Sequence, residues 1–226
     1  MCLGSITARA NLEHELLEKH EENSAEDQAR FARNQKAGME EQALWQALSS
    51  RERSLMEKPL GTWEEQEAAD GEWRKDSAVV LLWALGQGGE LLPYDKEADD
   101  LALPPFDDAR KFINGAKLRS SEEIEKGRQA AELWLRRART TQLQMEHVDP
   151  PKGMTFETII GITAEGAEHS GYFKAVGKDF PAHGKPYSQL SEDEWETMRS
   201  IATERLYAFN WLCGYSADWD KVPTGT

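Results

Sequence analysis

Two short apolar segments, one ending before Gly86 and one before Gly214, constrain the fold of this chain more than any other feature of its sequence. Each follows a polar stretch of good helix formers and is apolar at nearly every position. A helix that is apolar on all faces is buried on all faces, and a glycine after its last turn favours a left-handed C-terminal cap. The sequence therefore predicts two central buried helices, at about residues 65–86 and 191–214.

Capping signals mark where the predicted helices begin. Ser191 is followed three residues later by Glu194, and Thr62 is followed in the same way by Glu65. A hydroxyl residue with an acid three positions on is the pattern of a capping box. A third helix is expected over residues 121–147, capped by Ser120 or Ser121 and packed against the two central helices.

The rest of the chain is predicted to be less regular. Residues 152–190 are rich in Gly and Pro and are expected to form a long irregular segment, with at most a short strand over 155–163. A short helix is expected over 107–113. Residues 1–37 are polar and suggest a helical arm of low stability, so that 38–226 form a single, mostly α-helical domain.

Composition limits the classes of function. The 226 residues carry a formal net charge of −14, which disfavours binding to nucleic acid or to anionic lipid. The acidic charge is expected to keep the protein in solution; the alternative is that it forms a face that binds a basic partner protein. Only two cysteines are present, and no apolar run reaches the length of a signal peptide core or a membrane span. We expect a cytoplasmic protein with no disulfide.

Polar groups inside and just after the last helix are the first candidate site. Arg205 and Asn210 lie within an apolar stretch and must find partners, because an unpaired buried polar group costs about 1–3 kcal/mol. Asp218 and Asp220 follow the helix, and one of them is expected to reach back to Arg205 or to a loop amide. The sequence favours a clamp that ties the chain end to the core.

A ligand pocket at the same junction is the alternative. Trp211 and Trp219 would form its walls, with Asn210 as the polar group that recognises the ligand. Asp179 in the long irregular segment joins this tentative binding set, and His169 or His183 nearby offers a general base. The eight tryptophans predict a tryptophan-rich core.

No motif in the chain carries a defined chemistry. The five histidines form neither HxxxH nor HExxH, and GxSxG, GxGxxG and GxxxxGK[ST] are missing. We therefore expect no metal and no cofactor. Arg136, Arg137 and Arg139 form the only dense basic patch; their expected partners are the chain's own carboxylates, and an anionic ligand is the alternative.

The sequence resembles a bacterial family, the domain of unknown function numbered 4272. The resemblance is expected over about residues 50–226, with most of its specificity in the last thirty residues, and with Gly225 standing where the pattern has an acid. It implies a bacterial, mostly helical domain and no activity. The residues that carry it are Trp73-Arg74, Leu82 to Gly86, Leu92-Pro93, Ala130 to Ala138, Asp179-Phe180, Gly184 to Tyr187, Glu204-Arg205, Ala208, Asn210-Trp211, Gly214 and Asp218-Trp219-Asp220.

Three hypotheses of function follow. The first is a non-enzymatic binding or accessory domain, because no catalytic constellation is evident. The second is an enzyme of unknown reaction, with a site near Arg205, Asn210, Asp218 and Asp220. The third is an acidic, immunity-type protein that binds a basic partner. The expected partners are thus a basic protein or a small ligand.

Overall fold

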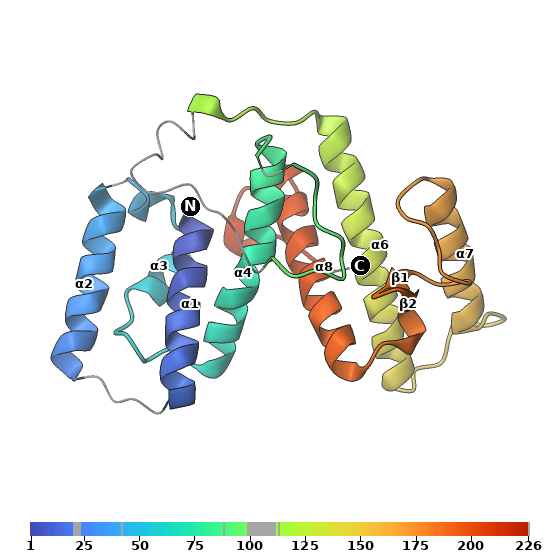
Figure 1. Ribbon diagram of the computed structural model, residues 1–226, viewed down its shortest axis with the longest axis horizontal. Helices are drawn as coiled ribbons and strands as arrows, with labels where there is room; N and C mark the ends of the chain where they lie inside the picture. Colours follow the sequence, from blue (N-terminus) through green and yellow to red (C-terminus); the bar gives the residue numbers. More distant parts are fainter. Residues whose placement is uncertain (20–23, 42, 88, 99–111, 113, 226) are drawn as a thin grey trace. The chain divides into compact units, whose positions relative to one another are not determined.

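The computed structural model describes residues 1–19, 24–41, 43–87, 89–98, 112 and 114–225. Helices dominate these residues, as the sequence predicted (Figure 1). The expected helix over 107–113 falls almost wholly outside the described residues. In chain order the elements are α1 (Cys2–Lys19), α2 (Ala25–Glu41), η1 (Trp45–Ala47), α3 (Ser50–Met56), α4 (Glu65–Ala84), α6 (Ser121–Met145), α7 (Phe156–His169), β1 (Pro181–Ala182), β2 (Lys185–Pro186), η3 (Tyr187–Gln189), α8 (Glu192–Leu212) and η4 (Trp219–Lys221).

The contacts group the chain into two compact units. Unit 1 consists of Met1–Leu91, Ala98–Arg119 and Gly214–Pro223. Unit 2 consists of Leu92–Glu97, Ser120–Cys213 and Thr224–Thr226. The sequence-based division into an arm over 1–37 and one domain over 38–226 stays a prediction.

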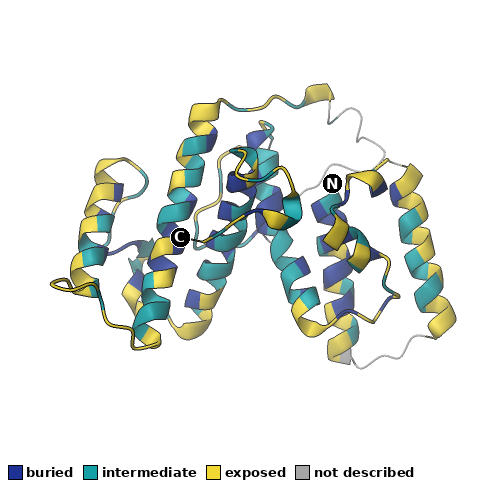
Figure 2. Ribbon diagram, turned by 180° about the vertical axis from the view of Figure 1, so that it is seen from behind, coloured by how far each residue is buried: buried dark blue, intermediate teal, exposed yellow. Residues whose placement is uncertain are grey.

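Unit 1 is built on the packing of α1 against α4, which run side by side (Figure 1). Gly71 on α4 makes this close approach possible, because a Cβ there would lie 2.8 Å from the Cβ of Ala10. Ile6, Trp45 and Trp63 belong to the core cluster beside this contact. By contrast, α2 has a single buried residue, Met39, and exposes most of its surface (Figure 2).

Unit 2 is built on the packing of α6 against α8, as the sequence predicted. Gly127 on α6 again permits the contact, since a Cβ there would lie 2.4 Å from Cζ of Phe209. Trp134 centres an aromatic cluster: its ring centroid lies 5.2 Å from that of Tyr94 and 5.1 Å from that of Phe180. The strands β1 and β2 form a two-stranded antiparallel pair.

Several local predictions are confirmed. Ser120 and Ser191 each cap a helix through a complete capping box, with Glu123 and Glu194 respectively. Gly86 and Gly214 follow α4 and α8 with positive φ angles of 74° and 80°, so both occupy the left-handed position that favours glycine.

Other local predictions are wrong. The segment expected as a strand over 155–163 forms most of α7, because Thr155 caps a helix there by accepting a hydrogen bond from the Thr158 N–H. The first central helix is capped by Glu64 rather than Thr62, whose hydroxyl donates to the Pro59 carbonyl instead. Trp211 is 38% exposed and does not belong to the core.

Candidate functional site

Arg205 is fully buried and binds backbone carbonyls of the segment 92–97. Its guanidinium donates to the carbonyl oxygens of Leu92 at 2.6 Å, Pro93 at 3.1 Å and Lys96 at 2.9 Å. The guanidinium carbon lies 4.8 Å from the centroid of the Tyr94 ring. Arg205 therefore holds a loop on α8, and these contacts give it no opening toward a ligand.

Asp179 is paired with Arg137, which was part of the predicted basic patch. Nε and Nη2 of Arg137 donate to the two carboxylate oxygens at 2.6 and 2.8 Å, and both side chains are buried. The N–H groups of Phe180 and Ser188 also donate to this carboxylate. Burial opposes ionisation, but the Arg137 guanidinium and these N–H groups outweigh it and hold the pKa of Asp179 below its usual range.

The residues after α8 have their described contacts in unit 1. Asp218 accepts a hydrogen bond from the Asp220 N–H and pairs with Lys221 at 2.8 Å. Asp220 accepts from the Arg51 N–H at 2.9 Å. The structure thus assigns Asp218, Trp219 and Asp220 to unit 1, and Arg205, Asn210, Trp211 and Asp179 to unit 2. The clamp and the pocket at this junction both stay predictions.

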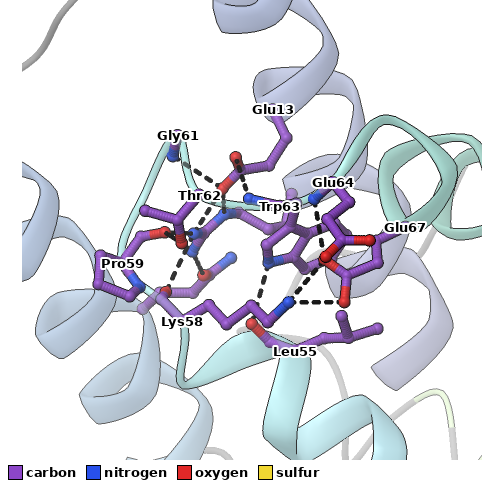
Figure 3. Close-up of polar contacts among 11 residues, drawn as sticks. Glu13, Leu55, Lys58, Pro59, Gly61, Thr62, Trp63, Glu64 and Glu67 are labelled. Carbon is purple, nitrogen blue, oxygen red and sulfur yellow. Dashed lines mark hydrogen bonds and ion pairs between the residues drawn. The ribbon is translucent and has the colours of Figure 1, made fainter.

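Sequence reasoning missed a second buried ion pair, between Arg9 and Glu13 in the supposed arm. Both side chains are 0% exposed and their charged atoms lie 2.6 Å apart. Arg9 also donates to the carbonyls of Lys58 and Pro59. Figure 3 shows the Glu13 carboxylate facing the backbone N–H groups of Gly61 and Trp63, at 3.0 and 3.3 Å. The four-residue spacing of the two charges, between apolar positions of one helix, is the signal that was available.

The three buried arginines share one role. Arg9 on α1, Arg137 on α6 and Arg205 on α8 each hold a distant loop to a helix. Such networks fix structure when every member has a partner. A binding surface must therefore be sought elsewhere in the described residues.

An open groove between α6 and α7 is the best candidate. It consists of two adjoining hollows, with volumes of about 510 Å³ and 320 Å³. Arg136 and Thr163 line both hollows and so join them. The larger hollow is lined by Gln129, Glu132, Leu133, Arg136, Ile162, Thr163, Gly166, Ala167, Ser170 and Tyr172. The smaller hollow is lined by Arg136, Arg137, Arg139, Thr140, Ile159, Ile160, Thr163 and Phe180.

The groove combines guanidinium groups with an apolar wall. The side chain of Arg136 is 59% exposed and pairs with Glu132, while Arg139 donates to the amide oxygen of Gln142. The predicted pairing of the basic patch with carboxylates is thus confirmed for Arg136 and Arg137. On the α7 side Ile162 is 60% exposed and leaves apolar surface open to a ligand.

The described part of the chain offers no metal site. No three His, Cys, Asp or Glu side chains gather there in a way that would hold an ion. Within the same residues, no helix has the length and apolar character needed to cross a membrane.

The described residues form a mostly helical protein with an open groove between α6 and α7. Residues 3–155 match the family described as Domain of unknown function (DUF4272), and the chain belongs to this family. The family is the one that the sequence suggested, but the expected extent is wrong: the match begins at residue 3 and ends before the C-terminal motif. No curated protein and no solved structure gives a significant match.

Proposed function

We propose that this chain is a non-enzymatic binding domain whose binding surface is the groove between α6 and α7. The observation that carries the proposal is the joining of two hollows through Arg136, with exposed aliphatic surface at Ile162 opposite. Ligand sites are typically concave and mostly apolar, with a few polar groups that orient the ligand. The groove fits a ligand that has an anionic group and an apolar portion.

The placement of the other candidate residues supports a binding role over an enzymatic one. The enzyme hypothesis requires Arg205 to line an open pocket, yet this side chain is buried against three carbonyl groups. Asp179 is likewise engaged by Arg137 and by two backbone N–H groups. A general acid or base must reach its substrate, and these groups face their own partners.

We also propose a cytoplasmic location in a bacterial cell. Both cysteines, Cys2 and Cys213, are free thiols in the structure, although neither is fully buried. Burial and the neighbouring Glu125 carboxylate raise the pKa of Cys213 to about 11, so its reactive thiolate is scarce. Free thiols of this kind are typical of a reducing compartment.

The fluorescent anion 8-anilinonaphthalene-1-sulfonate tests the proposal, because it carries a sulfonate on an apolar ring system. Its emission should rise on mixing with the folded protein. The double variant Arg136→Gln/Arg139→Gln should weaken binding about fivefold, since each exposed charge contributes modestly.

The matched control is Arg30→Gln/Arg33→Gln on α2, which removes the same charge from exposed positions of another helix. This control should bind the dye as the unmodified protein does. Equal loss in both double variants would mean that net charge, and not the groove, governs binding.

A further inference from the structure

We propose that the groove between α6 and α7 receives an amphipathic α-helix of a partner protein, with a carboxylate at the edge of its apolar face. This inference rests on the proposed function, because it names the occupant of the same groove. A docked helix presents side chains to a hydrophobic groove at three- and four-residue spacing. The shape, the walls and the charge of the groove each match such an occupant.

The groove follows the periodicity of its two helices. Its α6 wall runs from Gln129 to Thr140 and its α7 wall from Ile159 to Ser170, in both cases at steps of mainly three and four residues. Eleven residue steps along a helix extend about 16 Å, or three turns. The groove is therefore as long as a short recognition helix, and its two hollows would take apolar side chains from successive turns.

Small residues flatten one part of the α7 wall. Gly166, Ala167 and Ser170 line the larger hollow, and a Cβ built on Gly166 would meet nothing within 4 Å. A wall of such small residues lets another backbone approach closely. The hydrogen bond from the Tyr172 hydroxyl to Gln129, at 2.6 Å, joins two residues that line this hollow.

The charge of the groove selects the partner. Arg136 and Arg139 offer planar guanidinium groups that recognise carboxylates, whereas Glu132 on the same wall is held by Arg128 and Arg136. The chain as a whole carries a net charge of −14, which repels a strongly acidic partner. The fitting occupant thus has one or two carboxylates facing α6 and a basic outer face.

A synthetic peptide tests this assignment directly. It would be about 14 residues long, with leucines along one face, a glutamate at the edge of that face and lysines on the outer face. Binding is followed by fluorescence polarisation. We expect saturable binding, about fivefold weaker for Arg136→Gln/Arg139→Gln, and at least tenfold weaker for a peptide of the same composition in scrambled order.

Blocking the small-residue wall gives a second, independent test. Gly166→Leu places a side chain in the open hollow and should abolish peptide binding while the helical circular dichroism signal is kept. Gly38→Leu on α2 is the matched control, because a Cβ there also meets nothing within 4 Å. This control should bind the peptide normally.

The outcomes separate the two proposals. If the anilinonaphthalene sulfonate binds in an Arg136-dependent way but the ordered peptide binds no better than the scrambled one, the helical occupant is wrong and the groove remains a small-ligand site. If neither probe distinguishes the groove variants from their controls, both proposals fail. Peptide binding that survives Gly166→Leu would also overturn the helical assignment.

Discussion

Among single residues, three buried arginines contribute most clearly to holding distant loops against helices. Arg9, Arg137 and Arg205 bind loops through carboxylates or carbonyl groups. All three side chains are buried. The sequence predicted the burial of Arg205, because it stands in an apolar helix. It did not predict the partners, since Leu92 lies 113 residues earlier and offers only its carbonyl. Every residue has a backbone carbonyl, so the sequence does not indicate which carbonyl accepts a hydrogen bond from Arg205.

Asp179→Asn should destabilise unit 2 by about 3 kcal/mol at pH 7, because it leaves the buried Arg137 charge without its carboxylate. Folding lowers the pKa of Asp179. Its stabilising contribution is therefore complete above the pKa of the unfolded chain, about 4, and is lost as the pH falls through the lower pKa of the folded state. Urea unfolding of both proteins at pH 7 and at lower pH measures this difference.

The stability gap between Asp179→Asn and the unmodified protein should narrow as the pH falls toward 3. Glu194→Gln serves as the control: Lys185 and the Ser191 N–H lower the pKa of Glu194 to about 2, yet this ion pair is far less buried than that of Asp179. An ion pair open to solvent in part contributes less than a buried one, so this variant should stay closer to the unmodified protein than Asp179→Asn does. A gap for Asp179→Asn that does not change with pH would contradict the assigned ion pair.

Glu13→Gln tests the pair that sequence reasoning missed. The substitution keeps the size of the side chain but leaves Arg9 buried without a counter-charge, which should cost about 3 kcal/mol. Thermal unfolding followed by circular dichroism measures the loss. An unchanged melting temperature would contradict this role of the ion pair and would support the prediction that residues 1–37 form a loosely attached arm.

At the scale of elements, most caps and the packing of α6 against α8 were predictable, whereas the Thr62 cap and the helix α7 were not. Ser191, Gly86 and Gly214 were assigned correctly, and Ser120 was one of the two serines proposed as a cap, because capping depends on a few neighbouring residues. The helix α7 was mistaken for a strand, because its β-branched Thr and Ile residues favour strands locally. Tertiary contacts at Ile160, Ala164 and Ala167, one buried face at helical spacing, override that preference.

Two glycines set how closely the helix pairs approach. Gly127→Ala would bring a Cβ to 2.4 Å from Phe209, and Gly71→Ala would bring one to 2.8 Å from Ala10. Overpacking costs about 1–3 kcal/mol, which outweighs the gain of up to about 1 kcal/mol in helix propensity. Both variants should lose stability in chemical denaturation. Gly38→Ala, on an open face of α2, should instead gain about 0.5–1 kcal/mol, and a gain at Gly127 or Gly71 would contradict the packing.

At the scale of the whole molecule, the contacts group into two units, whereas the sequence suggested one domain after an arm. The sequence carries this information poorly, because each unit combines segments that are distant in the chain. If the units respond separately, Gly71→Ala should speed hydrogen exchange in α1 and α4 and leave α6 and α8 unchanged. Uniform acceleration would favour one cooperative domain.

The groove itself could not be predicted from the sequence. Its basic patch and the resemblance to a family of unknown function were visible, but the opposing wall was assigned to a strand and loop. Only the pairing of α6 with α7 brings Arg136 opposite Ile162.

The most direct measurement of the central claim is a methyl NMR titration of isoleucine-labelled protein with the amphipathic peptide. The chain has seven isoleucines, and three of them, Ile159, Ile160 and Ile162, lie on α7. If the groove is the binding surface, the methyl signals of Ile159 and Ile162 shift in a saturable way while those of Ile6, Ile124 and Ile201 stay in place. Shifts confined to Ile6, Ile124 or Ile201, with α7 silent, would contradict the account.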